Sequence, residues 1–201
     1  MMTVERAERE LKIAEGMTHG LWAPHSRSAA VNARLIAEKC GMDGDKAYVL
    51  GLLHDIGRRE GSWGVEHIFD GYDYMTKLGE HQIARICLTH SYPEISNFDD
   101  YIVRLTCSDE RKAFLKSYLD GIEYDDYDRL IQLCDAISLP TGACIMEKRL
   151  VDVALRHGVR EFSVEKWKSF MLIKKWFDEM CGCNIYTLLP NVAENSFENL
   201  I

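Results

Sequence analysis

The chain has 201 residues and a net charge of −8, and hydrophobic residues make up 47% of it. This length can bury one sizeable core, as a single domain or as a main domain with a helical annex. The negative charge argues against general nucleic-acid binding, which depends on neutralising phosphates with Lys and Arg. No apolar stretch approaches the roughly 20 residues that span a bilayer, and the charged N-terminus does not resemble a signal peptide. We therefore expect a soluble, cytoplasmic protein that does not bind membranes.

The first helices are predicted from apolar residues at helical spacing. A stripe near the N-terminus consists of Val4, Ala7, Leu11 and Ala14. The next helix starts near His25 and ends at Gly41, and its apolar residues are Val31, Leu35 and Ile36. Asp43 is a candidate N-cap for the helix that follows. The two helices should form an antiparallel hairpin that returns the end of the second helix to the neighbourhood of His25.

Only helices are predicted further along the chain, because no run alternates convincingly with period two. The expected segments are 65–78, 81–90, 109–119, 124–138, 143–157 and 164–181. Glycines between or at the ends of the segments are typical helix stops, namely Gly41, Gly57, Gly79, Gly121, Gly142, Gly158 and Gly182. The tail from Asn184 to Ile201 is expected to be an irregular cover with a frayed end. The sequence therefore predicts an all-α fold.

The seven cysteines are an odd number spread through the predicted helices. We expect a reducing compartment, in which they serve as small core residues. Cys181-Gly-Cys183 lacks the usual spacing of a zinc site, so we expect no function for it.

The dipeptide His54-Asp55 is the most informative feature for function, because it follows the apolar run 48–53 where a helix is about to end. Its imidazole and carboxylate can bind one divalent ion, and the second carboxylate oxygen is free to bridge to another. However, a lone His on an apolar helix is usually a satisfied core residue. The dipeptide indicates a metal centre only if further ligands accompany it.

Two further residues can complete such a centre. His25 lies near the start of the preceding helix, so the predicted hairpin brings it close to His54. Asp135 lies among apolar residues of a strongly helical segment, where a carboxylate is costly to bury unless it is paired or bound to a cation. The alternative is an Asp at a solvent-facing helix edge. We favour the ligand role, because the nearby acidic cluster 125–128 is polar enough to be solvated.

The set His25, His54-Asp55 and Asp135, with the sequence Gly51-Leu-Leu-His-Asp-Ile-Gly57 around the dipeptide, resembles the HD-domain superfamily of metal-dependent phosphohydrolases. The resemblance covers about residues 20–140, which leaves about 141–201 as a C-terminal helical annex of one domain, 1–201. It implies an all-α bundle with the metal at its centre. It also implies hydrolysis of a phosphate ester or phosphoanhydride.

His67 and His90 raise the question of a second metal. His90 continues the helical spacing of the apolar residues in 83–87 and so lies on a buried face, whereas His81 is the polar start of that helix. In the two-metal branch of the family, which includes enzymes similar to the symmetrical diadenosine tetraphosphate hydrolases, two such histidines bind the second ion. We favour two metals. The alternative is that His67 is a surface residue or is hydrogen-bonded to a ligand.

An anionic substrate needs positive groups near the metal, and a guanidinium can clamp a phosphate with two hydrogen bonds. The candidates are Arg58-Arg59, Arg27 and Lys148-Arg149. Arg59 fits better as a residue that stabilises a helix end, and for Arg58 both roles stay open. Trp22 and Trp63 could stack on a nucleobase, although isolated aromatic residues usually serve packing.

These residues lead to a hypothesis about the reaction. One or two divalent ions would activate a water that hydrolyses a nucleotide or another small phosphorylated substrate, with Asp55 bridging the ions and Arg58 offsetting charge on the transferring group. Fe, Mn, Co, Ni, Zn and Mg all suit such ligands. Two alternatives are a di-iron oxygenase on the same scaffold and a non-catalytic module that senses a nucleotide, which would not need the whole ligand set. The oligomeric state is not predicted.

Overall fold

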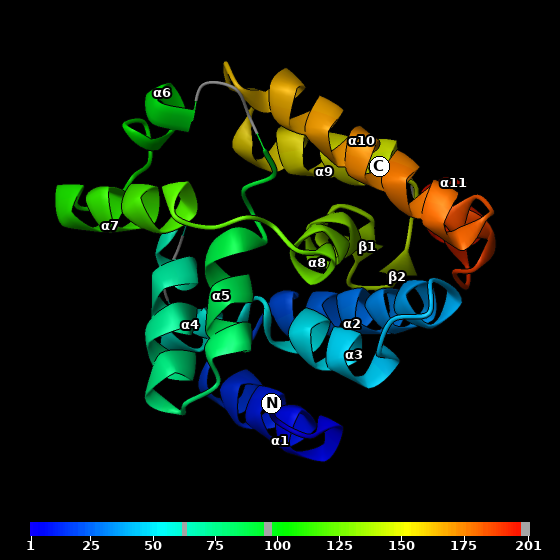
Figure 1. The fold of residues 1–201 in the computed structure, drawn as a ribbon, viewed down its shortest axis with the longest axis horizontal. Coiled ribbons are helices and arrows are strands. Elements are labelled where there is room, and N and C mark those ends of the chain that lie inside the picture. Colours follow the sequence, from blue (N-terminus) through cyan, green and yellow to red (C-terminus); the bar gives the residue numbers. More distant parts are fainter. Residues whose placement is uncertain (62–63, 95–97, 198–201) are drawn as a thin grey trace.

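Helices form almost all of the regular structure of the protein. The computed structural model describes residues 1–61, 64–94 and 98–197, and Figure 1 shows how its elements are arranged. The elements in the first half are α1 (Val4–Met17), α2 (Trp22–Lys39), α3 (Gly44–Leu53), the 3-10 helix η1 (Ile56–Glu60), α4 (Glu66–Lys77) and α5 (His81–Thr89). Those in the second half are α6 (Phe98–Ile102), α7 (Asp109–Asp120), α8 (Asp126–Ala136), β1 (Ser138–Leu139), β2 (Gly142–Ala143), α9 (Met146–His157), α10 (Ser163–Cys181), η2 (Ile185–Thr187) and α11 (Val192–Phe197). The all-α fold predicted from the sequence is confirmed.

The predicted helix ends differ from the observed ones by at most three residues, but some short elements were not predicted. The expectation of helices only is wrong at β1 and β2, which pair antiparallel as Ser138 with Ala143 and Leu139 with Gly142. Two residues in each strand are too few for period-two alternation to appear in the sequence. The tail was expected to be irregular, yet it contains η2 and α11 before the described part of the chain ends.

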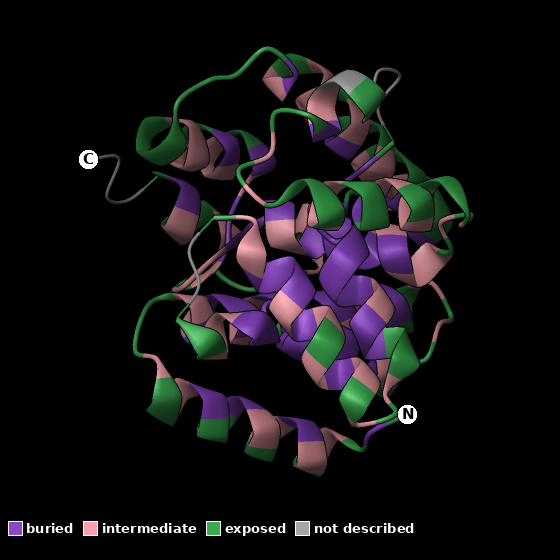
Figure 2. Cartoon of the chain, turned by 90° about the vertical axis from the view of Figure 1, so that its left-hand side faces the viewer, coloured by how far each residue is buried: buried purple, intermediate pink, exposed green. Residues whose placement is uncertain are grey.

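The N-terminal helix lies against the bundle with the predicted stripe inward. Thr3 caps α1 because its side chain accepts a hydrogen bond from the backbone N–H of Arg6. Ala7, Leu11 and Ala14 are buried, and Figure 2 shows the buried residues of this helix facing the rest of the molecule. The apolar spacing in the sequence therefore located both this helix and its packing face.

The helices α2 and α3 pack closely as the predicted hairpin. Asp43 caps α3 by accepting a hydrogen bond from the backbone N–H of Lys46. A Cβ atom on Gly51 would come within 2.9 Å of the Cα of Ala30, so the glycine permits this approach. The buried face of α2 is rich in alanine, and Val31, expected in the apolar stripe, is instead 40% exposed. Small side chains let the two backbones approach and thereby decide which face of α2 is buried.

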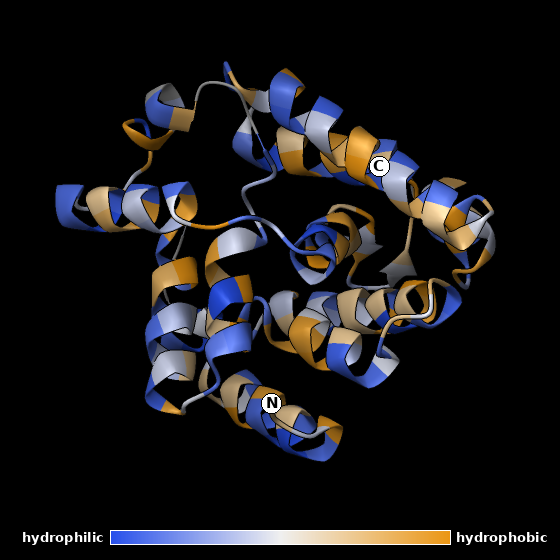
Figure 3. Ribbon diagram, viewed as in Figure 1, coloured by the Kyte–Doolittle hydropathy of each residue, from blue (hydrophilic) through white to orange (hydrophobic). Residues whose placement is uncertain are grey.

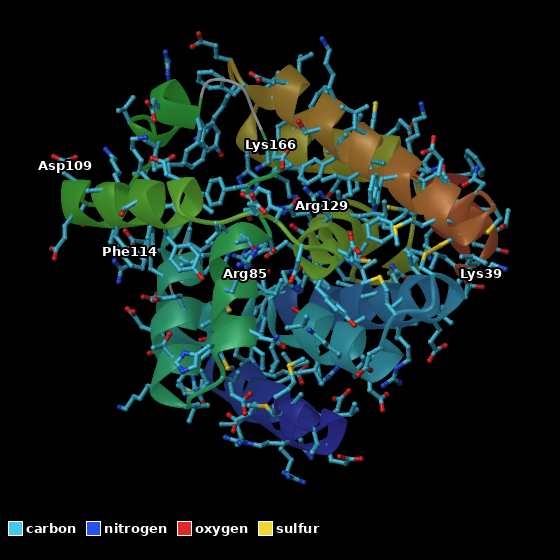
Figure 4. The ribbon with its side chains drawn as sticks, viewed as in Figure 1. Lys39, Arg85, Asp109, Phe114, Arg129 and Lys166 are labelled. Atoms are coloured by element: carbon cyan, nitrogen blue, oxygen red, sulfur yellow. A yellow bond between two sulfur atoms is a disulfide. The ribbon has the colours of Figure 1, made fainter. Side chains whose placement is uncertain are left out.

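The acidic cluster 125–128 was expected to be solvated, and this is wrong for Asp128, which is fully buried. Asp125 is the N-cap of α8 and forms a capping box with Asp128. Asp128 also receives the guanidinium of Arg85 from α5, with its nearest contact at 2.5 Å, and the hydroxyl of Thr89 at 2.8 Å. In Figure 4 the side chain of Arg85 extends from α5 toward α8. This ion pair joins the two helices in the interior.

The cysteines differ in their roles. Cys87, Cys134 and Cys144 are buried free thiols, as expected of small core residues. Cys40 and Cys181 form a disulfide instead, so the expectation that all seven are reduced core residues is wrong for this pair. The disulfide joins the ends of α2 and α10 across 141 residues of sequence. It thereby connects the C-terminal helices to the central hairpin.

The C-terminal helices cover α8. Both α9 and α10 contact α8, and α10 also contacts α2. Hydrophobic and hydrophilic residues share the surface of α10, as Figure 3 shows, and Phe170 and Phe177 are its largest buried side chains. None of the helices in the described ranges combines the length and the apolar character that a membrane crossing requires.

Candidate metal centre

The structure brings together all six residues that the sequence predicted as metal ligands, and each comes from the end of a helix. They are His25 in the first turn of α2, His54 at the C-terminus of α3, Asp55 before η1, His67 in the first turn of α4, His90 at the C-terminus of α5 and Asp135 in the last turn of α8. Five are buried, with at most 6% exposed, and Asp135 is partly exposed. The order of helices predicted from the sequence thus assembles a polar centre inside an apolar bundle.

Three overlapping groups of these side chains have the spacing of a metal site. The groups are His25 with His54 and Asp55, His54 with His90 and Asp135, and Asp55 with His67 and His90. Within each group the ligand atoms lie within 4.8 Å of one another. Asp55 belongs to both the group that contains His25 and the group that contains His67. These two groups therefore share the Asp55 carboxylate.

Backbone carbonyls orient the four imidazoles. In each ring Nδ1 lies next to a carbonyl oxygen, and the pairs are His25 with Ser138 at 3.2 Å, His54 with Gly51 at 2.7 Å, His67 with Gly64 at 2.6 Å and His90 with Ile86 at 3.1 Å. Because a carbonyl oxygen only accepts, Nδ1 must donate, and in the neutral ring Nε2 then carries the free lone pair. The carbonyls thus prepare four Nε2 atoms as ligands.

The short strand pair β1–β2 helps to orient His25, because the carbonyl beside His25 Nδ1 belongs to Ser138. Ser138 opens β1, and its hydroxyl donates to the carbonyl of Cys134 at 2.6 Å. Asn32 on α2 donates to the same hydroxyl at 2.9 Å. These bonds fix the Ser138 carbonyl that orients His25. Sequence reasoning missed both residues, because a carbonyl that orients a side chain leaves no pattern in the sequence.

Three atoms of the centre that could bind a metal lack hydrogen-bond partners among the described residues. Nε2 of His54, Nε2 of His67 and Oδ1 of Asp55 are buried and make no hydrogen bond to the described residues. His67 Nε2 and Asp55 Oδ1 lie 3.0 Å apart without the geometry of a hydrogen bond. Polar atoms left unsatisfied in the interior are costly. Their number in one place indicates that a ligand completes the set.

A divalent transition metal fits these donors. The atoms are imidazole nitrogens and carboxylate oxygens without a thiolate. Ligand atoms at about 2.1 Å from one ion are separated by about 3 Å when they occupy adjacent octahedral positions. His67 Nε2 to Asp55 Oδ1 at 3.0 Å and His25 Nε2 to Asp135 Oδ1 at 2.9 Å match this separation.

The charge states also suit a cation. Burial lowers the pKa of His90 to about 3 and lowers the pKa of His25, which favours the neutral form that binds metals. Burial alone would raise the pKa of Asp55, but the charge of Arg58 holds it well below the usual value. Burial would also raise the pKa of Asp135, but the adjacent imidazole of His25 holds it well below the usual value. Both carboxylates are therefore ionised.

Gly57 allows two of the predicted ligands to meet. A Cβ atom at this position would lie 2.0 Å from the carbonyl oxygen of His67 and 2.4 Å from the backbone nitrogen of Gly71. Only glycine lets η1 pack this closely on α4. The sequence analysis predicted Gly57 as a helix stop, whereas its role in the structure is this contact, which sets Asp55 beside His67.

The arginines near the dipeptide point in different directions. Arg58 Nε donates to Asp55 Oδ2 at 2.6 Å, and its side chain is one-third exposed, so it lies at the edge of the centre. Arg59 instead stacks on the ring of Tyr74. The suggestion that Arg27 serves the substrate is wrong, because its guanidinium pairs with two glutamates of α1. Attraction to these nearby carboxylates turns Arg27 away from the centre.

Of the remaining candidates, Arg149 reaches the centre, with Nη2 3.9 Å from Asp135 Oδ1. Its neighbour Lys148 is partly buried on α9. Trp22 packs against the core and donates from Nε1 to the carbonyl of Thr18 at 3.0 Å, which is a packing role. Trp63 lies outside the described residues.

A model of the HD domain matches residues 22–139, more than half of the chain and the whole segment from His25 to Asp135. No curated protein and no solved structure matches the chain. HD domains bind divalent metals and are largely metal-dependent hydrolases. With its helical bundle and its central cluster of His and Asp residues, the chain belongs to the HD-domain family.

Proposed function

We propose that the protein is a metal-dependent phosphohydrolase that cleaves a phosphate ester or phosphoanhydride of a nucleotide or another small molecule. The observation that carries this proposal is the set of buried Nε2 and carboxylate atoms without hydrogen-bond partners in the described chain. Two guanidinium groups lie beside this set, one at Asp55 and one at Asp135. A metal centre next to fixed positive charge suits an anionic substrate.

The six residues divide into two ligand sets. His25, His54, Asp55 and Asp135 would hold a first ion, and Asp55, His67 and His90 would hold a second. When bound, divalent ions lower the pKa of water toward neutrality and polarise phosphoryl oxygens. The two-ion arrangement is supported by Asp55, which belongs both to the group that contains His25 and to the group that contains His67.

Arg58 and the burial of the histidines would position and shield the reacting groups. Arg58 holds Oδ2 of Asp55, which leaves Oδ1 directed toward Nε2 of His67 at 3.0 Å and of His90 at 3.7 Å. The guanidinium of Arg58 also places charge beside the transferring phosphoryl group. Because the histidines are buried, bulk water is kept away from them and their interactions with charge are strengthened.

The experiment combines metal analysis with anaerobic turnover. The protein is purified without added metal, its metal content is measured, and a panel of phosphate esters and anhydrides is incubated with it without oxygen. We expect phosphate release that stops on chelation and returns when metal is restored. A di-iron oxygenase would instead show no anaerobic turnover and would consume oxygen. A metal-loaded protein that releases phosphate from no member of the panel would contradict the proposal.

A further inference from the structure

The candidate metal centre opens toward solvent at Asp135. The side chain of Asp135 is 25% exposed, whereas that of Asp55 is 6% exposed. Arg149, on α9, lies beside this carboxylate at 3.9 Å. The helix α9 lies beyond the segment 22–139 that the family model matches. A substrate that approaches from this side therefore meets a residue that the C-terminal helices supply.

Arg149 has hydrogen-bonding capacity that the protein does not use. Its Nη1 donates to Asp152 Oδ2 at 2.9 Å, which holds the guanidinium in place. Its Nε is buried and has no hydrogen-bond partner among the residues that the structure describes. An unsatisfied donor of a buried guanidinium is costly, and the oxygen of an anion would satisfy it.

Arg149 is one of several guanidinium groups near His157. Burial lowers the pKa of His157, and four guanidinium groups lie close enough to lower it further, namely Arg156, Arg160, Arg58 and Arg149. Asp152 is the carboxylate that holds two of these groups, because its Oδ2 also accepts from Arg156 at 2.8 Å. The guanidinium groups of Arg58, Arg149 and Arg160 around His157 define a basic rim in a chain whose net charge is −8. It would attract an anion with more charge than one phosphate group.

We infer that Arg149 binds the phosphate group next to the one that is hydrolysed, so that the substrate carries at least two adjacent anionic groups. The inference rests on the proposed function. Arg58 pairs with the buried Asp55, whereas Arg149 lies beside the more exposed Asp135, so each guanidinium can contact a different phosphate group. The substrate class is then a phosphoanhydride, such as a nucleoside diphosphate or polyphosphate, rather than a monoester.

The test compares two anions on the metal-loaded protein by calorimetry. The probes are inorganic phosphate and methylenediphosphonate, in which a carbon bridge prevents hydrolysis. We expect the wild type to bind the diphosphonate at least about tenfold more tightly, because its second phosphonate forms a charged hydrogen bond that inorganic phosphate does not. Arg149→Ala should remove most of this preference and leave phosphate affinity within about threefold of the wild type. Arg149→Lys, which keeps the charge, should retain part of the preference.

Arg156→Ala is the matched control, since it breaks the other ion pair to Asp152 Oδ2 but removes a half-exposed side chain that, in the described structure, forms no ion pair with Asp55 or Asp135. It should keep the preference. The inference is overturned if Arg149→Ala keeps the preference, or if it loses metal, which would make Arg149 a support for Asp135. It is also overturned if the wild type binds both anions equally, although hydrolysis of a monoester would then still stand. Binding of neither anion would contradict the proposed function as well.

Discussion

Asp128 and Asp55 are two buried acidic residues near the C-terminal end of α5, and they differ in how their charge is compensated. Asp128 lies in the first turn of α8 and Thr89 ends α5, and there the carboxylate accepts hydrogen bonds from Arg85, Thr89 and the backbone of Asp125. Asp55, next to the end of α5 at His90, has a guanidinium at Oδ2 and no hydrogen bond at Oδ1. Both carboxylates are almost completely buried.

This difference separates a structural ion pair from a ligand site. The Asp128 cluster is complete within the protein, so it needs nothing further and fastens α5 to α8. The Asp55 centre adds imidazoles whose Nε2 atoms lack partners within the described structure. Because burial of unpaired polar atoms is costly, the incomplete cluster is the one that should bind a ligand. Burial of charge alone would not have distinguished the two.

The largest effect is expected for Asp55→Ala. This variant removes the residue shared by both ligand sets, so hydrolysis and metal binding should fall below detection. The fold should persist, because the partner left behind, Arg58, is one-third exposed and can be hydrated. Turnover, metal analysis and circular dichroism measure the three properties. Activity with wild-type metal content would overturn the assignment of the site.

Asp128→Ala should have the reverse outcome. Removing one partner of a buried ion pair destabilises a protein by roughly 3–5 kcal/mol, and here Arg85 and Thr89 both lose their acceptor. Denaturant unfolding of the metal-free protein measures the loss. The fraction that remains folded should bind as much metal as the wild type. If this variant lost metal without losing stability, the distinction between the two clusters would be wrong.

His67→Ala and His90→Ala sharpen the account of the Asp55 centre. If these residues hold a second ion, each variant should bind about one ion rather than about two, and activity should fall steeply. The first ion should stay with His25, His54, Asp55 and Asp135. With a single ion, the same variants would alter only substrate handling. Undiminished metal content in both would refute the two-ion model, whatever happens to the rate.

Arg58→Ala is expected to have the smallest effect of the four. The metal should stay bound, since Arg58 contacts Asp55 only at Oδ2. Loss of a phosphate donor should raise KM or lower kcat by about 10- to 100-fold. Arg59→Ala is a suitable control, because its guanidinium stacks on Tyr74. Unchanged kinetics would leave Arg58 as a residue that only anchors Asp55.

His90 and Asp135 could be found in the sequence because they interrupt apolar helical runs, and His54-Asp55 because it ends one. The predicted hairpin brought His25 to His54, whereas His67 was suggested by the resemblance to the two-metal branch of the family. The burial of Asp128 could not be predicted from its neighbours in the sequence, since its ion-pair partner Arg85 lies 43 residues away. The ion pairs of Arg27 could not be predicted either, because they depend on how α1 packs. The disulfide between Cys40 and Cys181 depends on contacts across the whole fold.

The metal content of the wild-type chain tests the central claim most directly. After purification without added metal, or after reloading with a single type of divalent metal, we expect about two ions per chain. Chelation should lower the unfolding midpoint, and restoring the ion should raise it again, because a ligand that binds only the native state stabilises it. A chain that takes up no divalent ion, and whose unfolding midpoint is the same with and without metal, would contradict the account.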